Sequence, residues 1–154
     1  TYGDWSSDVC SSDLEEINKI TKEIQKELFL VAGSVANPKW QEAPSPYLTP
    51  GMIERLTVEV NKIESMEGIL SDWSLTGDVS SAAAYDIART MCRRAERCVV
   101  RMQLNGENVD AQIITYLNRL SDLLWLLGRL LELKAGVDSR LRREGEGQRW
   151  SRAW

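Results

Sequence analysis

The sequence predicts an all-α protein, an antiparallel bundle of four or five helices, and three observations indicate this fold. Apolar residues recur at spacings of three and four along four long segments, which is the pattern of amphipathic helices. No segment alternates apolar and polar residues as a half-buried strand would. All four prolines fall within residues 37–50, so proline interrupts none of the four segments. Short links between long helices favour antiparallel neighbours.

The first two helices are separated by the proline-rich stretch. The first is expected over residues 14–35, where apolar residues lie three and four apart between Lys and Glu, and Asp13 is its candidate N-cap. Thr49 and Pro50 are typical of an N-cap followed by a first helical residue. The second helix is expected to start there and to end near Gly68.

The third helix follows a connector over residues 69–78. Asp78 or Ser80 is expected to cap it, since both side chains accept hydrogen bonds from free backbone N–H groups. It is expected to run to about Leu104, because Asn105-Gly106 is a typical stop signal.

The fourth helix is expected to be capped by Asn108 and to run to about Leu133. It has two faces at helical spacing. The apolar face comprises Ile113, Leu117, Leu120, Leu124, Leu127 and Leu131. Asn118, Asp122 and Trp125 follow one another by four and three residues on another face.

Three parts are expected along the chain. Residues 1–14 are rich in Ser and Asp, lack a clear period and resemble translated adapter sequence, so they are interpreted as non-native or as a disordered polar N-terminus. Residues 15–133 form the helical domain. Residues 134–154 are interpreted as a flexible tail, because they are rich in Gly and Arg.

Composition excludes several classes of site. There is no histidine among the 154 residues, which excludes Ser-His-Asp triads and His-ligated metals in this chain. The net charge of −4 argues against nonspecific nucleic-acid binding. No apolar run reaches the roughly 18 residues that a membrane span needs. The three cysteines form no CxxC pair and favour a reducing, cytoplasmic location.

One basic stretch stands out from the acidic chain. Five arginines lie between Arg89 and Arg101 against one acid, Glu96. Helical spacing places Arg89, Arg93, Glu96 and Arg97 on one side of the third helix. The apolar positions of that helix are expected to be Ala88, Met91, Cys92, Ala95, Val99 and Met102. A packed helix with a row of guanidinium groups suits a polyanion such as a triphosphate. A solvated arginine face remains the alternative.

Two motifs resemble a known family. RTMCRRAERCVV at 89–100, followed by YLNRLSD at 116–122, is similar to the paired signature of PduO-type ATP:cob(I)alamin adenosyltransferases. The resemblance covers roughly residues 15–133. It implies a homotrimer of helical bundles with active sites at subunit interfaces. It also implies transfer of the 5′-deoxyadenosyl group of ATP to reduced cobalamin, with release of triphosphate.

The resemblance also implies which residues form the site. ATP would be bound by Arg93, Arg94, Ala95, Glu96, Arg97 and Asn118. Arg89 and Asp122 would support the site, through salt bridges, and Arg93 would contact phosphate during the reaction. Mg²⁺ would accompany ATP, and no protein-ligated metal is expected. Because cob(I)alamin is itself a strong nucleophile, the protein would position the reactants and stabilise the departing triphosphate.

Two regions of the chain differ from the family pattern. Trp73 aligns with a family aromatic residue, usually Phe, that lies beneath the corrin ring. The family's N-terminal Gly/Thr-rich phosphate loop has no counterpart here, and Ser6 and Ser7 stand where an acidic pair is expected. This difference predicts weakened ATP binding or impaired activity.

Two other functions remain open from the sequence. One is a noncatalytic bundle whose arginines pair with acids of a partner. The other is a sensor that binds ATP without turnover. Binding of ATP with Mg²⁺ separates the first of these from the enzyme, and cobalamin-dependent release of triphosphate separates the second.

Overall fold

The computed structural model describes residues 11–70 and 74–141. Its main elements are α1 (Ser11–Ala36), α2 (Pro50–Glu64), α3 (Ser80–Leu104) and α4 (Ala111–Lys134), with a short 3₁₀ helix, η1 (Trp40–Glu42), after α1. Within these residues the secondary structure is helical apart from one isolated bridge between Ser74 and Arg140. The prediction of an all-α bundle is therefore confirmed, with four α-helices.

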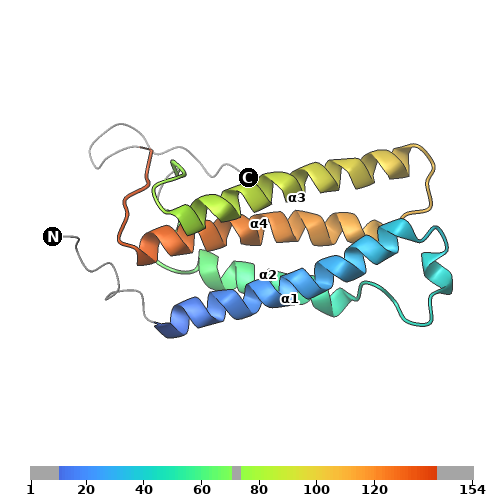
Figure 1. Cartoon of the computed structure of the whole chain (residues 1–154), viewed down its shortest axis with the longest axis horizontal. Helices are drawn as coiled ribbons and strands as arrows, with labels where there is room; N and C mark the ends of the chain where they lie inside the picture. The colour runs from blue at the N-terminus through green and yellow to red at the C-terminus, as the bar shows by residue number, and fades with distance from the viewer. Residues whose placement is uncertain (1–10, 71–73, 142–154) are drawn as a thin grey trace.

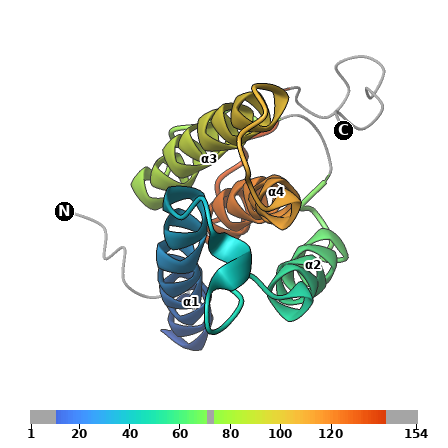
Figure 2. The same cartoon turned by 90° about the vertical axis from the view of Figure 1, so that its right-hand side faces the viewer.

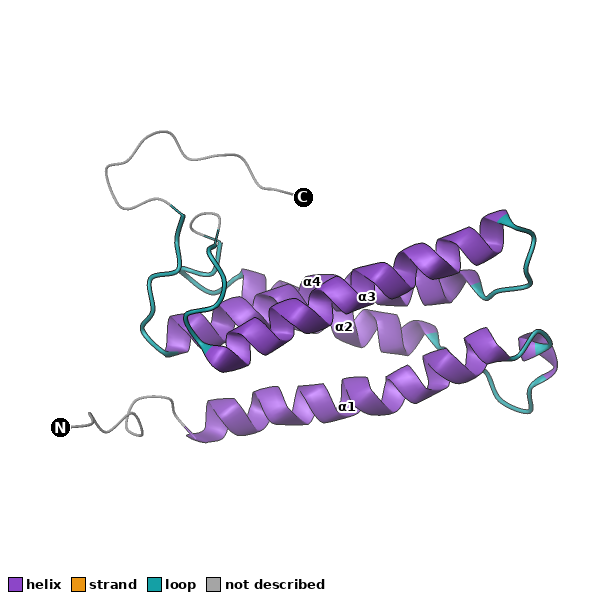
Figure 3. Cartoon of the chain, turned by 45° about the horizontal axis from the view of Figure 1, so that its top comes forward, coloured by secondary structure: helices purple, strands orange, loops and turns teal. Residues whose placement is uncertain are grey.

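Successive helices run in opposite directions along one long axis (Figure 1). Viewed along that axis, α4 lies in the middle, with α1, α2 and α3 around it (Figure 2). The view coloured by secondary structure shows the same four long helices joined by loops (Figure 3). The start of α3 and the end of α4 lie at the same end of the bundle, so the connector before α3 meets the segment that follows α4.

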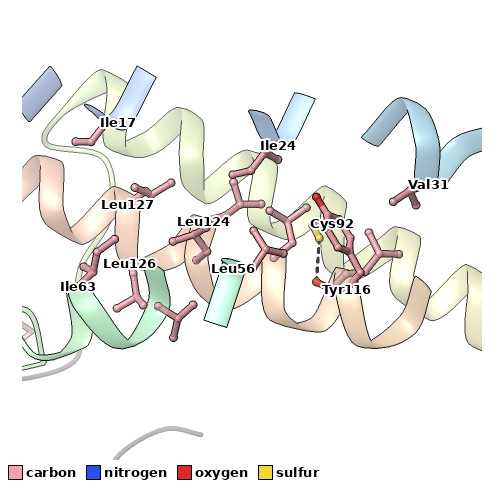
Figure 4. Packing of buried hydrophobic residues seen from close by; sticks show 14 of the residues in the cluster. Ile17, Ile24, Val31, Leu56, Ile63, Cys92, Tyr116, Leu124, Leu126 and Leu127 are labelled. Atoms are coloured by element: carbon pink, nitrogen blue, oxygen red, sulfur yellow. Dashed lines mark hydrogen bonds between the residues drawn. The ribbon is translucent and has the colours of Figure 1, made fainter. Parts of the chain in front are cut away.

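The central position of α4 follows from its sequence. Its predicted apolar seam is buried from end to end, including Ile113, Leu120 and Leu127 at 1% exposure or less. Figure 4 shows this side of α4 packed with residues of the other three helices, among them Leu56 of α2 and Ile24 of α1. Burial of such aliphatic side chains contributes about 1.5–3 kcal/mol each.

A polar network also joins three of the helices. Tyr116 of α4 is fully buried and its hydroxyl donates to Glu27 of α1 at 2.7 Å. The same carboxylate pairs with Arg55 of α2. Because burial removes the phenol from water and a carboxylate faces it, the pKa of Tyr116 is raised.

Several predicted helix ends are wrong. The helix α1 begins at Ser11, so Asp13 lies inside it, and α2 ends at Glu64, four residues before Gly68. Val79 precedes α3 without a side-chain cap, so neither Asp78 nor Ser80 is its N-cap.

The N-cap of α4 also differs from the prediction. Asp110 accepts from the Gln112 N–H at 2.9 Å, which is the capping bond expected of Asn108. Asn108 instead donates to the Pro38 carbonyl at 2.8 Å and bonds Gln41. A long-range contact therefore decided between two suitable capping residues.

The orientation of α3 differs from the prediction at its apolar positions. Cys92 and Val99 are buried as expected, whereas Ala88, Met91 and Ala95 are exposed. Glu96 lies beside the arginines as predicted, but it is buried, at 8% exposure. The apolar face of α3 is therefore wide, and its outer stripe, which includes Ala88, Met91 and Ala95, is not covered within the described residues. In the described part of the chain, no helix is long and apolar enough to cross a membrane.

Candidate functional site

The arginine face of α3 borders an open cavity of about 510 Å³. Its lining comprises Arg93, Arg94, Glu96, Arg97, Val100 and Arg101. Arg94 and Arg97 are exposed and Arg93 is half-buried. Four guanidinium groups against one carboxylate make this cavity suitable for a polyanion.

Glu96 lies on the buried side of this cavity and bonds two of the predicted site residues. Its Oε2 is paired with Arg93, and its Oε1 accepts from the Asn118 amide at 3.2 Å. Both oxygens of a buried carboxylate are therefore engaged by two of the predicted ATP-binding residues. The structure brings Arg93, Glu96 and Asn118 together from α3 and α4, as the sequence predicted, and gives Glu96 the geometry of a positioning group.

A second cavity, of about 470 Å³, lies one helical turn toward the start of α3. It is lined by Glu64, Ser74, Thr76, Asp86, Arg89, Thr90, Arg119, Asp122, Trp125 and Leu126. Here the structure brings the predicted pair Arg89 and Asp122 to one cavity, beside the apolar surfaces of Trp125 and Leu126. The two cavities share no lining residue, and α3 borders both.

Of the salt bridges that the resemblance implies at Arg89 and Asp122, the structure shows one, at Asp122. Asp122 pairs with Arg119 on its own helix at 3.3 Å, and within the described residues Arg89 has no hydrogen bond or ion pair. Partial burial of Asp122 raises its pKa, and this effect outweighs the neighbouring positive charges of Arg119 and Arg93. The Asp122 side chain nevertheless remains 46% exposed, so its burial is only partial.

Sequence reasoning missed two charged residues behind the second cavity. Arg129 and Glu132 of α4 are 4% and 1% exposed, and neither is among the site residues predicted from the sequence. The available signal was spacing, because they extend the polar line of Asn118, Asp122 and Trp125 by steps of four and three.

Two predicted features remain without a structural test. Trp73 lies outside the described residues, as do Ser6 and Ser7. Ala95 is exposed and is absent from the lining of the arginine cavity. In the described parts of the chain, no group of three or more His, Cys, Asp or Glu residues is arranged to hold a metal ion.

Comparison with known proteins shows which family and which relatives the chain is similar to. The family model described as Cobalamin adenosyltransferase matches residues 4–131. Human corrinoid adenosyltransferase MMAB is 34% identical over 131 residues, which cover 82% of this chain and 50% of that protein. Cobalamin adenosyltransferase from Cupriavidus metallidurans is 31% identical over 122 residues, covering 79% of this chain and 63% of that one. The chain spans about half the length of the curated relatives it matches.

Solved structures show the same fold. A phenylalanine-to-alanine variant of the PduO-type ATP:corrinoid adenosyltransferase from Lactobacillus reuteri, complexed with cobalamin and ATP, superposes with a TM-score of 0.76. The sequences are 24% identical, and the match covers 88% of this chain and 75% of that one. An arginine-to-lysine variant of the same protein, complexed with ATP, gives a TM-score of 0.75 at 22% identity.

Proposed function

Because the chain belongs to the cobalamin adenosyltransferase family, we propose that it transfers the 5′-deoxyadenosyl group of ATP to the cobalt of cob(I)alamin and releases triphosphate. One observation carries this proposal. A cavity lined by arginines and a cavity lined partly by apolar groups lie one helical turn apart on α3. Two substrates bound there would meet at the turn between Arg89 and Arg93.

The arginine cavity is the proposed triphosphate site. Arg93 and Arg97 would bind phosphate oxygens, and Arg94 and Asn118 would complete the ATP site. The developing charge on the departing triphosphate grows in the transition state, so prepositioned guanidinium groups stabilise that state more than the bound substrate. Glu96 would fix Arg93 and Asn118 before ATP arrives.

The second cavity is the proposed corrinoid side. It would take one edge of the corrin ring against Trp125 and Leu126, and Ser74 in its wall directly follows Trp73, to which the family resemblance assigns the ring contact. Arg89 and Asp122 lie in the same wall and would support the site as charged neighbours.

The chemistry makes few demands on protein nucleophiles. Cobalt(I) donates an electron pair to the ribose C5′, the C5′–O bond breaks, and the electron pair of that bond leaves on triphosphate. Cobalt becomes formally Co(III), so the step balances without another oxidant. The protein contributes position and charge. Mg²⁺ would enter with ATP, held by phosphate oxygens.

We also propose a homotrimer whose subunit interfaces complete the ATP sites. The exposed apolar stripe of α3 supports it, because Ile87 and Met91 are 66% and 59% exposed and Ala84, Ala88 and Ala95 lie on the same side. The arginines lie next to this stripe around the helix. A neighbouring subunit packed on the outer stripe would therefore form the missing wall of the arginine cavity.

The location proposed is the cytoplasm. Cys92 and Cys98 are free thiols, which is the usual state in a reducing compartment.

The direct experiment is an anaerobic absorbance assay with cob(I)alamin, ATP and Mg²⁺. The expected result is loss of the cob(I)alamin band and formation of a light-sensitive alkylcobalamin with one triphosphate per turnover. ATP binding without conversion would support the sensor instead, and no binding of either substrate would support a noncatalytic bundle. A chain carrying a family-like N-terminal phosphate loop, assayed beside it, shows whether the predicted impairment exists.

The arginine cavity makes its own prediction. Arg93→Ala should weaken ATP binding by about tenfold or more, because it removes a charged phosphate contact. Arg101→Ala serves as a comparison, because Arg101 lines the same cavity at its far end. Isothermal titration with Mg-ATP measures both, and unchanged ATP affinity in Arg93→Ala would contradict the assignment.

A further inference from the structure

The wall of the second cavity depends on charged residues that do not themselves line it. Asp86 and Trp125 line the cavity from α3 and α4, and Ser74 lines it from the connector before α3. Each of these three is held by Arg129 or Glu132, which belong to the last turns of α4.

Arg129 holds the two helical groups. Its Nη2 donates to Asp86 at 2.9 Å, and its Cζ lies 5.6 Å from the centroid of the Trp125 ring. The guanidinium is almost fully buried, so these contacts are poorly screened by solvent. One side chain thus fixes an acid of α3 and an indole of α4 relative to each other.

Glu132 holds the connector. Its Oε2 accepts from the Ser139 hydroxyl at 2.7 Å and from the Ser74 hydroxyl at 3.3 Å. The Ser74 and Ser139 hydroxyl oxygens also lie 2.8 Å apart, and the Leu75 N–H donates to the Ser139 carbonyl at 2.7 Å. The segments before α3 and after α4 are therefore joined through one buried carboxylate.

The two residues also bind each other. Arg129 Nη2 donates to Glu132 Oε1 at 3.2 Å, and Arg129 Nε lies 3.1 Å from Glu132 Oε2. A buried pair of this kind contributes little net stability compared with apolar residues, because both charges are desolvated. Its geometric effect is larger, since each charge is fixed in place by the other.

We propose that Arg129 and Glu132 are positioning residues that set the shape of the corrinoid side of the site by holding Ser74, Asp86 and Trp125. This inference rests on the proposed function for the identity of the ligand. The arginine cavity for ATP shares no lining residue with the groups that this pair holds. A defect in the pair should therefore appear in corrinoid binding and leave ATP binding unaffected.

The test compares Glu132→Gln with Glu27→Gln. Both changes remove an ion-paired carboxylate of the bundle, with the Glu27 side chain 13% exposed and that of Glu132 1%. Glu27 bonds Tyr116 and Arg55, which line neither cavity. Glu132→Gln should raise the half-saturating cob(I)alamin concentration about tenfold, the usual effect of losing a charged hydrogen bond, with that for ATP within about twofold. Arg129→Lys, which keeps the charge but not the fork, should fall between wild type and Arg129→Met.

Hydrogen exchange gives a readout that needs no activity. The Leu75 amide should exchange faster in Glu132→Gln, whereas amides of α1 and α2 keep their protection. Unchanged Leu75 exchange would overturn the inference. The inference would also be overturned if Glu132→Gln changed the half-saturating concentrations of cob(I)alamin and ATP equally, with a loss of thermal stability like that of Glu27→Gln.

Failure of the proposed function would give a different experimental result. In that case the wild-type chain itself leaves cob(I)alamin unconverted and does not bind cob(II)alamin in equilibrium dialysis, while the Leu75 exchange still reports whether Glu132 holds the connector. If the wild type is inactive but binds cob(II)alamin, the affinity for cob(II)alamin tests the inference instead. This affinity should then be lower in Glu132→Gln.

Discussion

At the scale of single residues, the site is set by which charges the fold withholds from water. Glu96 is buried with both oxygens bonded, so it serves Arg93 and Asn118. Asp122 is only partly buried and lies in a cavity wall, where a carboxylate is less stable than in water. The two acids of the paired motifs thus have different surroundings, one buried behind Arg93 and one in the wall of a cavity.

The raised pKa of Asp122 makes a prediction about stability. Its ordinary pKa is 3.8, and the folded value is higher. Between the two values the native state binds more protons than the unfolded state, so this group lowers stability as pH rises through that window. Asp122→Asn should therefore leave Tm at pH 7 unchanged or higher while it lowers the adenosyl-transfer rate. Thermal unfolding of both proteins from pH 3 to 7 measures this, and a lower Tm for the variant at pH 7 would contradict it.

Cys92 illustrates a nucleophile made inert by its surroundings. Burial and the charge of Glu96 raise the pKa of its thiol to about 11, and its Sγ donates to the Leu117 carbonyl at 3.2 Å. The thiolate is the reactive form, so iodoacetamide at pH 8 should modify Cys98 well before Cys92 in the native chain. Peptide mass spectrometry before and after addition of urea follows this. Equal labelling of the two cysteines in the folded protein would be the contrary result.

At the scale of elements, the site is a polar seam between two antiparallel helices. Glu96 bonds Asn118, and Asp86 bonds Arg129. The residue numbers of each pair add to nearly the same value, as the contacts of two antiparallel helices must. Arg89 and Arg93 of α3 therefore fall opposite Trp125 and Asp122 of α4. One helix register thus connects the phosphate side with the buried Arg129–Glu132 pair.

The predictable part of this seam was its residue pattern. Spacing placed Arg89, Arg93 and Glu96 on one side of α3, and the family motifs placed Asn118 and Asp122 opposite them. The orientation of α3 was not predictable, because its apolar face is wider than one neighbouring helix covers and only packing on α4 determines which part is buried. The N-cap of α4 was missed for a related reason, since Asn108 is engaged by Pro38 and Gln41.

The packing of α1 on the rest of the bundle makes a prediction at the scale of elements. Tyr116→Phe removes the donor that meets Glu27 and leaves a carboxylate that is 13% exposed with Arg55 alone. The expected loss is about 1–3 kcal/mol of unfolding free energy. Urea denaturation measures it, and Tyr47→Phe is a matched control, because the Tyr47 hydroxyl only accepts a longer bond, 3.3 Å, from Asn37. Equal stability of the two variants would indicate that the buried bond contributes little.

At the scale of the whole molecule, α3 has more apolar surface than its own bundle covers. Its outer stripe contains Ile87 and Met91, both more than half exposed. Isolated exposed apolar residues are ordinary, whereas a stripe at helical spacing beside a binding cavity is typical of an interface. The arginine cavity is open, so the proposed trimer would bury the stripe and close the ATP site in one step.

The last prediction tests this link between assembly and binding. Met91→Glu places a carboxylate in the proposed contact, and an unpaired charge there would be desolvated at high cost. The trimer should therefore dissociate. Apparent ATP affinity should fall with it, although Met91 is not among the residues that line the arginine cavity. Light scattering gives the mass, and titration with Mg-ATP at several protein concentrations shows whether affinity follows assembly.

The matched control is Val58→Glu, because Val58 is 56% exposed on α2, away from the stripe. It should keep both mass and ATP affinity. If Met91→Glu keeps its trimeric mass, the outer stripe of α3 is not the interface. If the trimer dissociates while ATP affinity is unchanged, each subunit carries a complete ATP site. Only the joint loss of assembly and affinity supports a site completed by the neighbouring subunit. Circular dichroism on the same samples measures Tm, because a general defect in folding would lower Tm as well.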